Sequence, residues 1–109
     1  MRRLEVFMND HRAGLLTEAQ YGRGYSFRYY PEYLASGMPP VSVTLPKRKE
    51  TYESERLFSF FSNMLPEGAN RKIICRSLRI DEKDFFGLLT AMAGRDFIGA
   101  VNVRAKEND

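Results

Sequence analysis

The chain holds few residues of the kinds that perform catalysis or bind metals. Its 109 residues include one histidine, His11, and one cysteine, Cys75. These counts exclude a multi-histidine site, a multi-cysteine metal site and an internal disulfide bond. His11 falls in an expected hairpin turn, where a histidine is usually solvated. Cys75 is flanked by Ile74 and Arg76. A neighbouring cation lowers the pKa of a thiol, but we expect a small buried residue here.

The glycine-containing segments do not form a phosphate-binding loop. Gly22-Arg23-Gly24 lacks the further spaced glycine and the strand-to-helix setting of such loops. Gly94-Arg95-Asp96-Phe97 has the letters of a kinase loop, but a kinase also needs a phosphate-covering loop, an ATP-orienting lysine and metal ligands on separate elements. Gly94 is instead expected to end a helix, with a local partner for Arg95 or Asp96. We therefore expect a protein that is not an enzyme and that uses no cofactor and no metal.

Basic side chains gather at two places in a chain whose formal net charge is only +3. Lys72, Arg76 and Arg79 recur at helical spacing, so they form either a phosphate-contacting stripe or the solvated face of a helix. The run 47–49 (Lys-Arg-Lys) follows a proline at an expected strand end, where charge protects a sheet edge. Because of these residues, an alternative hypothesis is that the protein is a DNA-binding or operon-regulating module.

A corner suited to protein contact is expected where an apolar helix face meets Pro66. The residue before a proline is pushed out of the helical conformation, so the helix must end here. The Met64 and Leu65 side chains then either enter the core or lie exposed beside the break. Glu67 and Arg71 can offer charge-assisted hydrogen bonds from the same corner.

Two hydrophobic periods predict the elements that would position these residues. Alternation of apolar and polar residues predicts strands at 4–8, 25–29 and 41–45. An apolar run after a turn at Asn9-Asp10 predicts a further strand at 13–16, and residues 97–103 also have strand character. Helical spacing predicts one turn at 31–35 and helices at 57–65, 71–78 and 85–92, with Asp81 as an N-cap. The expected order is β-β-β-(α)-β-α-α-α-β. It describes an α+β fold with a curved, mostly antiparallel sheet of about five strands packed against three helices.

Length and composition predict a single domain over residues 1–109, with a core at about 4–104 and a frayed tail at 105–109. An aromatic fraction of 13% excludes intrinsic disorder of the body of the chain. No apolar run reaches the ~20 residues that cross a bilayer, and the N-terminus does not resemble a signal peptide. With a single cysteine, this favours the cytoplasm. The expected core residues include Leu4, Val6, Phe27, Val43, Phe58, Leu88 and Val101.

Four stretches resemble the N-terminal subdomain of HipA-type serine/threonine kinases, the toxins of bacterial toxin–antitoxin modules. The most specific is 61–71, which matches the family pattern F-x-N-L-L-P-E-G-x-x-R with Met64 in place of a frequent Leu. The others are the opening hairpin 4–16 with its G-x-L strand, the F-x-Y and S-x-x-L-P strands at 25–29 and 41–46, and G-x-D-x-x-G-A-V at 94–101. In the last stretch Phe97 stands where a cysteine is frequent. The resemblance covers residues 4 to 104.

The resemblance implies a free-standing version of that subdomain, like the HipS-type protein of three-gene modules. There the HipT-like kinase lacks the subdomain and a HipB-like helix-turn-helix protein binds DNA. A bacterial, cytoplasmic antitoxin is implied, which inhibits a HipA/HipT-like kinase by docking at its active-site cleft, joins a HipB-like protein, and contacts neither membrane nor nucleic acid directly. The expected kinase contact is Met64, Leu65, Pro66, Glu67, Gly68, Ala69, Asn70 and Arg71, with a second basic contact at Lys72, Arg76 and Arg79. The alternative is the N-terminal fragment of a longer HipA kinase.

Overall fold

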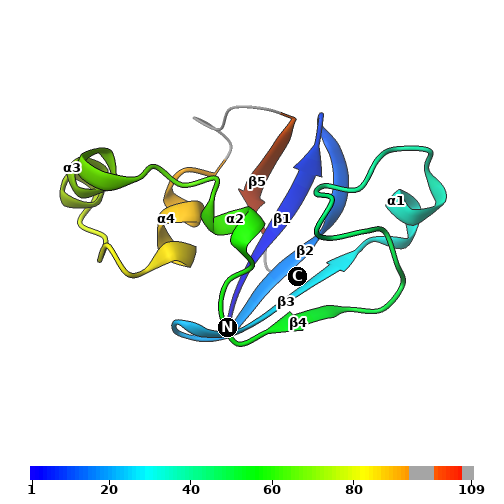
Figure 1. Cartoon of the computed structure of the whole chain (residues 1–109), viewed down its shortest axis with the longest axis horizontal. Coiled ribbons are helices and arrows are strands. Elements are labelled where there is room, and N and C mark those ends of the chain that lie inside the picture. The colour runs from blue at the N-terminus through cyan, green and yellow to red at the C-terminus, as the bar shows by residue number, and fades with distance from the viewer. Residues whose placement is uncertain (94–99, 107–109) are drawn as a thin grey trace.

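A computed structural model describes residues 1–93 and 100–106, which form a five-stranded antiparallel sheet with four helices (Figure 1). The strands are β1 (Arg2–Met8), β2 (His11–Gln20), β3 (Arg23–Tyr29), β4 (Tyr52–Ser54) and β5 (Val101–Ala105). The helices are α1 (Pro31–Ala35), α2 (Ser59–Ser62), α3 (Gly68–Leu78) and α4 (Phe85–Ala91). The α+β fold and the predicted order of elements are confirmed. The segment Gly94-Arg95-Asp96-Phe97 and the residues 107–109 of the expected frayed tail lie outside the described residues.

The strands are arranged in the order β4-β3-β2-β1-β5. Asn9 and Asp10 make the predicted turn between β1 and β2 with φ angles of 48° and 72°, a left-handed conformation that short polar side chains tolerate. β5 returns after three helices and pairs antiparallel with β1, with Val103 opposite Val6. The last strand therefore re-enters the sheet, as the order of elements predicted.

Gly14 allows β2 and β3 to approach each other closely. Val6 of β1 is opposite Gly14, whereas Phe7 is opposite Arg12, so Ala13 is the extra residue of a β-bulge. A Cβ on Gly14 would lie 2.4 Å from the Arg28 carbonyl oxygen and 2.8 Å from the Phe27 ring. No side chain fits at this position without moving the backbone of β3.

The hydrophobic core lies between the sheet and helices α2 and α4. Phe27 of β3, Phe61 of α2 and Phe86 of α4 are fully buried, and the Phe27 and Phe61 ring centroids are 5.6 Å apart. The predicted burial of four residues is confirmed: Leu4, Val6, Phe27 and Leu88. Phe58 and Val101 are only partly buried but pack against this core.

The strand predicted at 41–45 is wrong. The segment forms only an isolated bridge between Ser42 and Leu45, and Val43, expected in the core, is 91% exposed. The Tyr29 hydroxyl links both ends of this turn, because it donates to the Leu45 carbonyl and accepts from the Val41 amide at 3.1 Å. Val41 and Leu45 are thereby buried while Val43 points to solvent. The fourth strand, β4, lies further along the chain.

The predicted helices also needed correction at their ends. The stripe at 57–65 was interpreted as one helix, but α2 spans only Ser59–Ser62 and the flanking apolar residues enter the core as irregular chain. The predicted N-cap Asp81 is wrong as well. Asp84 caps α4 by accepting from the Gly87 amide at 2.9 Å, whereas Asp81 accepts from the Lys83 amide in the preceding turn.

A buried charge cluster fixes α4 to the sheet. The carboxylate of Glu18, 1% exposed, accepts from Arg2 at 2.6 Å and from the Tyr25 hydroxyl at 2.9 Å. The other side of the Arg2 guanidinium donates to Asp84 at 2.8 Å. Burial opposes the ionisation of Asp84, but the bonds from Arg2 and the Gly87 amide outweigh it, so the pKa of Asp84 lies below its usual value. Nothing in the sequence spacing indicated this cluster.

Two residues of the basic run 47–49 make contacts within the chain. The Lys47 ammonium donates to the carbonyls of Ser36 and Met38 at 2.8 and 2.9 Å and lies 5.1 Å from the centroid of the Tyr33 ring. The Arg48 guanidinium lies 3.6 Å from the centroid of the Tyr52 ring on the edge strand β4. The Arg48 contact agrees with the interpretation that this charge covers a sheet edge, whereas Lys47 bonds to the loop after α1. Within 1–93 and 100–106, no helix is long and apolar enough to cross a membrane.

Candidate partner-binding surface

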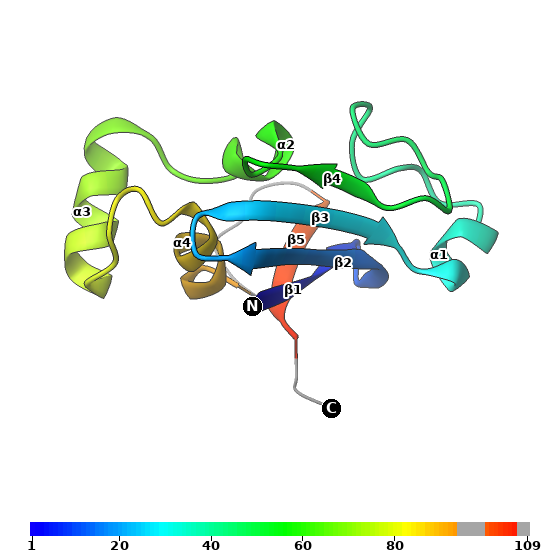
Figure 2. The ribbon, with the colours of Figure 1, turned by 90° about the horizontal axis from the view of Figure 1, so that it is seen from below.

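Helix α3 stands away from the sheet at one end of the molecule, opposite α1 (Figures 1 and 2). Of its 11 residues only Cys75 is buried, whereas Ile73 is 63% and Leu78 40% exposed. A helix that buries so little of its own apolar surface is typical of a contact for another protein. It carries much of the segment that the sequence predicted as a contact.

The segment 64–71 divides into a buried half and an exposed half. Leu65 is 4% exposed and belongs to the core, and Met64 is half-buried against the same core. The open choice between core and exposed contact is therefore decided for Leu65: it cannot touch a partner unless the core opens. The exposed residues are those that lead into and begin α3: Glu67, Gly68, Ala69 and Asn70.

Arg71 holds this corner in shape. Its Nε donates to the Pro66 carbonyl oxygen at 2.9 Å, and its guanidinium lies 5.0 Å from the centroid of the Phe85 ring. The first bond closes the turn between Pro66 and α3, and the second contact links α3 to the start of α4. Arg71 therefore positions the exposed turn 67–70, and its guanidinium is already engaged within the chain.

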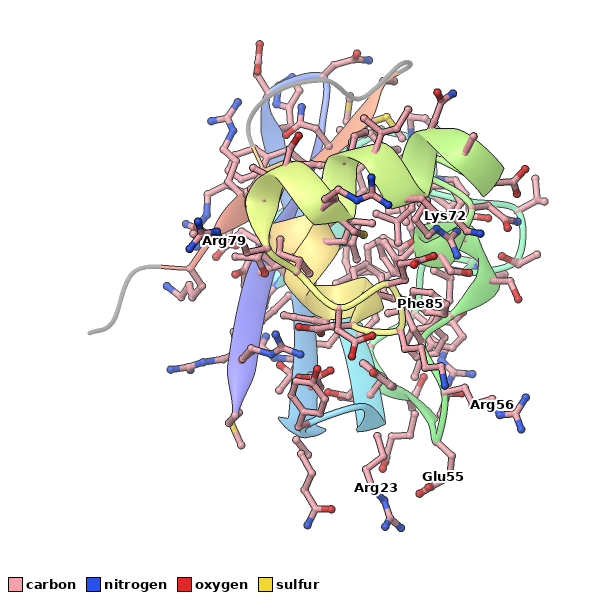
Figure 3. All side chains as sticks on the ribbon, turned by 90° about the vertical axis from the view of Figure 1, so that its left-hand side faces the viewer. Arg23, Glu55, Arg56, Lys72, Arg79 and Phe85 are labelled. Atoms are coloured by element: carbon pink, nitrogen blue, oxygen red, sulfur yellow. The ribbon has the colours of Figure 1, made fainter. Side chains whose placement is uncertain are left out.

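The three basic residues predicted as a stripe do not act as a single group. Arg79 is the C-cap of α3 with φ 58° and ψ 45°, so it leaves the helical geometry that the spacing assumed. Figure 3 shows Arg79 and Lys72 towards opposite ends of α3. Lys72 and Arg76 line a groove that Arg79 does not reach. None of the three forms an ion pair with a residue that the structure describes.

The lone cysteine and the lone histidine lie in different environments, Cys75 buried and His11 exposed. Burial raises the pKa of the Cys75 thiol, with nearby Glu82 and Asp81 acting in the same direction and Arg71 in the opposite one. Cys75 is thus the small buried residue that the sequence favoured. His11 is exposed as predicted, although it begins β2 instead of lying in the turn. Among residues 1–93 and 100–106, no cluster of three metal-ligating side chains occurs.

Sequence reasoning missed that Phe85 packs against the core only in part and also lines a groove beside α3. Its spacing marked it as an apolar member of a helix face, but the ring is half-buried, lies under Arg71 and lines the groove with Lys72. The available signal was the pair Phe85-Phe86, because adjacent residues at the start of a helix point in different directions and only one of them enters the core.

Comparison with known proteins places the chain in a family. Residues 4–104 match the family described as HipA N-terminal domain. An uncharacterized protein of Haemophilus influenzae is 33% identical over 103 residues, which cover 94% of this chain and 92% of that protein. A Sinorhizobium fredii protein named "Putative kinase Y4mE" is 27% identical over 110 residues, which cover all of this chain but 26% of that protein.

A solved structure agrees with these sequence matches. The chain is similar to the structure described as the N-terminal domain of HipA toxin, with a TM-score of 0.74 and 31% identity. The match covers 100% of this chain and 96% of that one. The fold around the signature at 61–71 is thus shared between the two proteins. The chain belongs to the HipA N-terminal domain family.

Proposed function

We propose that this chain is an antitoxin that binds a HipA/HipT-like serine/threonine kinase and inhibits it. The observation that carries the proposal is the contrast between two relatives. In one, the matched region is 26% of a protein named as a kinase, and in the other it is 92% of a protein of similar length. The same module therefore occurs both beside a much longer partner sequence and with little else. A module separated from its kinase is suited to bind the kinase in trans.

The contact with the kinase is proposed at Met64–Arg71, docked at the active-site cleft. The exposed turn 67–70 would touch the kinase, because Leu65 is buried and Arg71 is bonded to Pro66. Leu65 and the bond from Arg71 to Pro66 anchor both ends of this turn, and such anchoring would reduce the entropy lost on docking. A HipB-like DNA-binding protein is proposed as a further member of the complex. If the chain is instead part of a longer HipA kinase, the same turn would face the rest of that kinase.

The experiment uses a HipA-type kinase that lacks its own N-terminal domain. The purified chain is titrated into its phosphotransfer assay and co-expressed with it in a growth assay. We expect inhibition that follows mass action, with protection only when the chain exceeds its dissociation constant. A wild-type chain that neither binds nor inhibits such a kinase would contradict the proposal. Tight, steeply salt-dependent DNA binding by the isolated chain would favour the alternative of a DNA-binding module.

Two matched substitutions test the position of the contact. Ala69→Arg adds a large side chain to the exposed turn, and Ala35→Arg adds the same side chain to an exposed position of α1 at the opposite end of the molecule (Figure 1). Both positions are helical and exposed, so both variants should fold. Only Ala69→Arg should release the kinase. Equal inhibition by the two folded variants would place the contact elsewhere.

A further inference from the structure

A groove lies between α3 and the chain that leads into α4, and none of the residues 67–70 line it. It has a volume of about 790 Å³ and is open to solvent. Its lining is formed by Arg71, Lys72, Cys75, Arg76, Ile80, Asp81, Glu82, Lys83 and Phe85. Figure 3 views this face, with α3 crossing above Phe85. The two lining segments are neighbours in the sequence, separated by the C-cap residue Arg79.

The lining has three chemically distinct parts. α3 supplies a cationic wall, in which Lys72 and Arg76 are exposed and form no ion pair with any described residue. In contrast, Arg2, Arg12 and Arg104 each pair with a carboxylate within 3 Å. The floor is apolar, with half-buried Ile80 and Phe85 beside buried Cys75. The opposite lip carries the exposed carboxylates of Asp81 and Glu82 next to Lys83.

We infer that this groove binds a peptide segment of a partner protein that carries acidic side chains beside an apolar one. The acidic side chains would pair with Lys72 and Arg76, and the apolar side chain would cover Phe85 and Ile80. The cations outnumber the carboxylates in the lining by four to two, counted over Arg71, Lys72, Arg76 and Lys83 against Asp81 and Glu82. This balance favours a net-acidic ligand.

The mixed lining favours a peptide over a nucleic acid. A phosphate backbone presents one sign of charge along its whole length, so it would be repelled at the lip formed by Asp81 and Glu82. A peptide can place carboxylates against α3 and other groups against the lip, and it can fill the apolar floor. The inference does not require the partner to be a kinase, so its failure would leave the proposed function standing.

The test begins with a random peptide library displayed on phage and selected on the immobilised full chain. Enriched sequences are synthesised with a fluorescent label, and their binding is measured by anisotropy at low and high salt. We expect sequences that place Asp or Glu next to an apolar residue, with binding that weakens as salt rises. Absence of enrichment, or enrichment of sequences without acidic residues, would overturn the inference.

Variants then locate the binding. Lys72→Glu combined with Arg76→Glu reverses the wall, and Lys49→Glu combined with Arg56→Glu reverses two exposed cations outside the groove (Arg56 is labelled in Figure 3). The wall variant should bind the selected peptide roughly tenfold more weakly or worse, and the control variant should bind as wild type. Lys72→Gln combined with Arg76→Gln repeats the test if the charge reversal lowers the stability of α3.

Two further outcomes decide between the possible ligands and sites. Amide shifts on adding the peptide should map to α3 and residues 80–85, and shifts confined to other elements would overturn the inference. A labelled oligothymidine is measured in parallel. If it binds the wild-type chain more tightly than every selected peptide and the wall variant abolishes that binding, the groove is a nucleic-acid site and the inference is wrong.

Discussion

At the scale of single residues, a few contacts that no spacing rule predicts determine how the elements fit. Gly14 and Asp84 are the clearest cases. Gly14 is required by the approach of β3, and Asp84 both caps α4 and pairs with Arg2. Each therefore joins two parts of the chain that are distant in sequence, and each gives a prediction that compares it with a similar residue elsewhere.

Gly14→Ala should lower the free energy of unfolding by about 1–3 kcal/mol, because the new Cβ overlaps the Arg28 carbonyl oxygen and the Phe27 ring. Gly37→Ala is the control, since a Cβ at that position has open space. It should be neutral or slightly stabilising, as the unfolded chain loses freedom. Chemical denaturation of the two variants measures the difference, and equal stabilities would contradict the steric role of Gly14.

Asp84 should make the stability of the protein sensitive to acid. The pKa of Asp84 is lower in the folded state than in the unfolded state. Its contribution to stability is therefore complete at pH values above its unfolded-state pKa, and it is lost as the pH falls through its folded-state pKa. Asp84→Asn keeps a capping side chain but loses the charged bond to Arg2, which should cost about 1.5–3 kcal/mol at neutral pH. The variant should also show a smaller fall in stability towards low pH.

Asp81→Asn is the matched control for Asp84, because the Asp81 carboxylate is exposed and accepts from the nearby Lys83 amide, a bond that an Asn side chain can also accept. Both variants are measured by denaturant unfolding between acid and neutral pH, and Asp81→Asn should change the stability at neutral pH by no more than about 0.5 kcal/mol. A wild-type curve and an Asp84→Asn curve that run parallel over this range would show that the ionised Asp84 contributes nothing.

At the scale of elements, the chain between α2 and α3 places one residue in the core and exposes those that closely follow it. Leu65 is buried in the core, and two residues later the exposed turn 67–70 begins. α3 itself contributes one buried residue and leaves Ile73 largely exposed. The core therefore fixes the start of α3 while most of its surface remains available for a partner.

Leu65→Ala should cost about 2–5 kcal/mol of stability, because it removes a buried side chain and leaves a cavity. Ile73→Ala should change the stability by no more than about 0.5 kcal/mol, because Ile73 is 63% exposed. Thermal unfolding of both variants checks the contrast. A harmless Leu65→Ala would show that Leu65 faces outward, as the exposed alternative for this corner required.

At the scale of the whole molecule, the sheet separates two helical ends. The molecule measures 41 × 28 × 27 Å, and α1 and α3 lie at opposite ends of its long axis (Figure 2). The proposed contacts at the turn 67–70 and in the groove beside α3 both lie at one end. A partner bound there would leave the sheet and α1 free for a further protein of the complex.

The isolated chain should neither bind ATP with magnesium nor transfer phosphate. Phosphate transfer needs a phosphate-covering loop, a lysine and metal ligands in a fixed arrangement, which the sequence does not present. Incubation of the purified chain with labelled ATP and a general acceptor protein measures this, with an active HipA-type kinase as the positive control. Phosphate transfer by a preparation free of kinase would contradict the proposed function.

The fold class, the order of the elements and much of the core could be predicted from the residues alone. Alternation and helical spacing predict these correctly because they depend on which residues must leave water. They located β1 to β3, and they placed Leu4, Phe27 and Leu88 in the core. The signature at 61–71 also indicated the family, because its residue types and spacing are specific.

Tertiary structure alone decided which alternating segment pairs with the sheet and which corner residue is exposed. Val41 to Leu45 alternates like a strand, but the Tyr29 hydroxyl bonds both of its ends and turns it away from the ladder. The sequence left open whether Leu65 lies in the core or at the surface. In the structure α2 ends at Ser62, and Leu65 lies three residues later in the core. The groove beside α3 joins Lys72 to Phe85 across a turn. The first two outcomes depend on contacts with residues that are distant in sequence, and the groove depends on the turn at Arg79. Local periodicity carries no information about such contacts or turns.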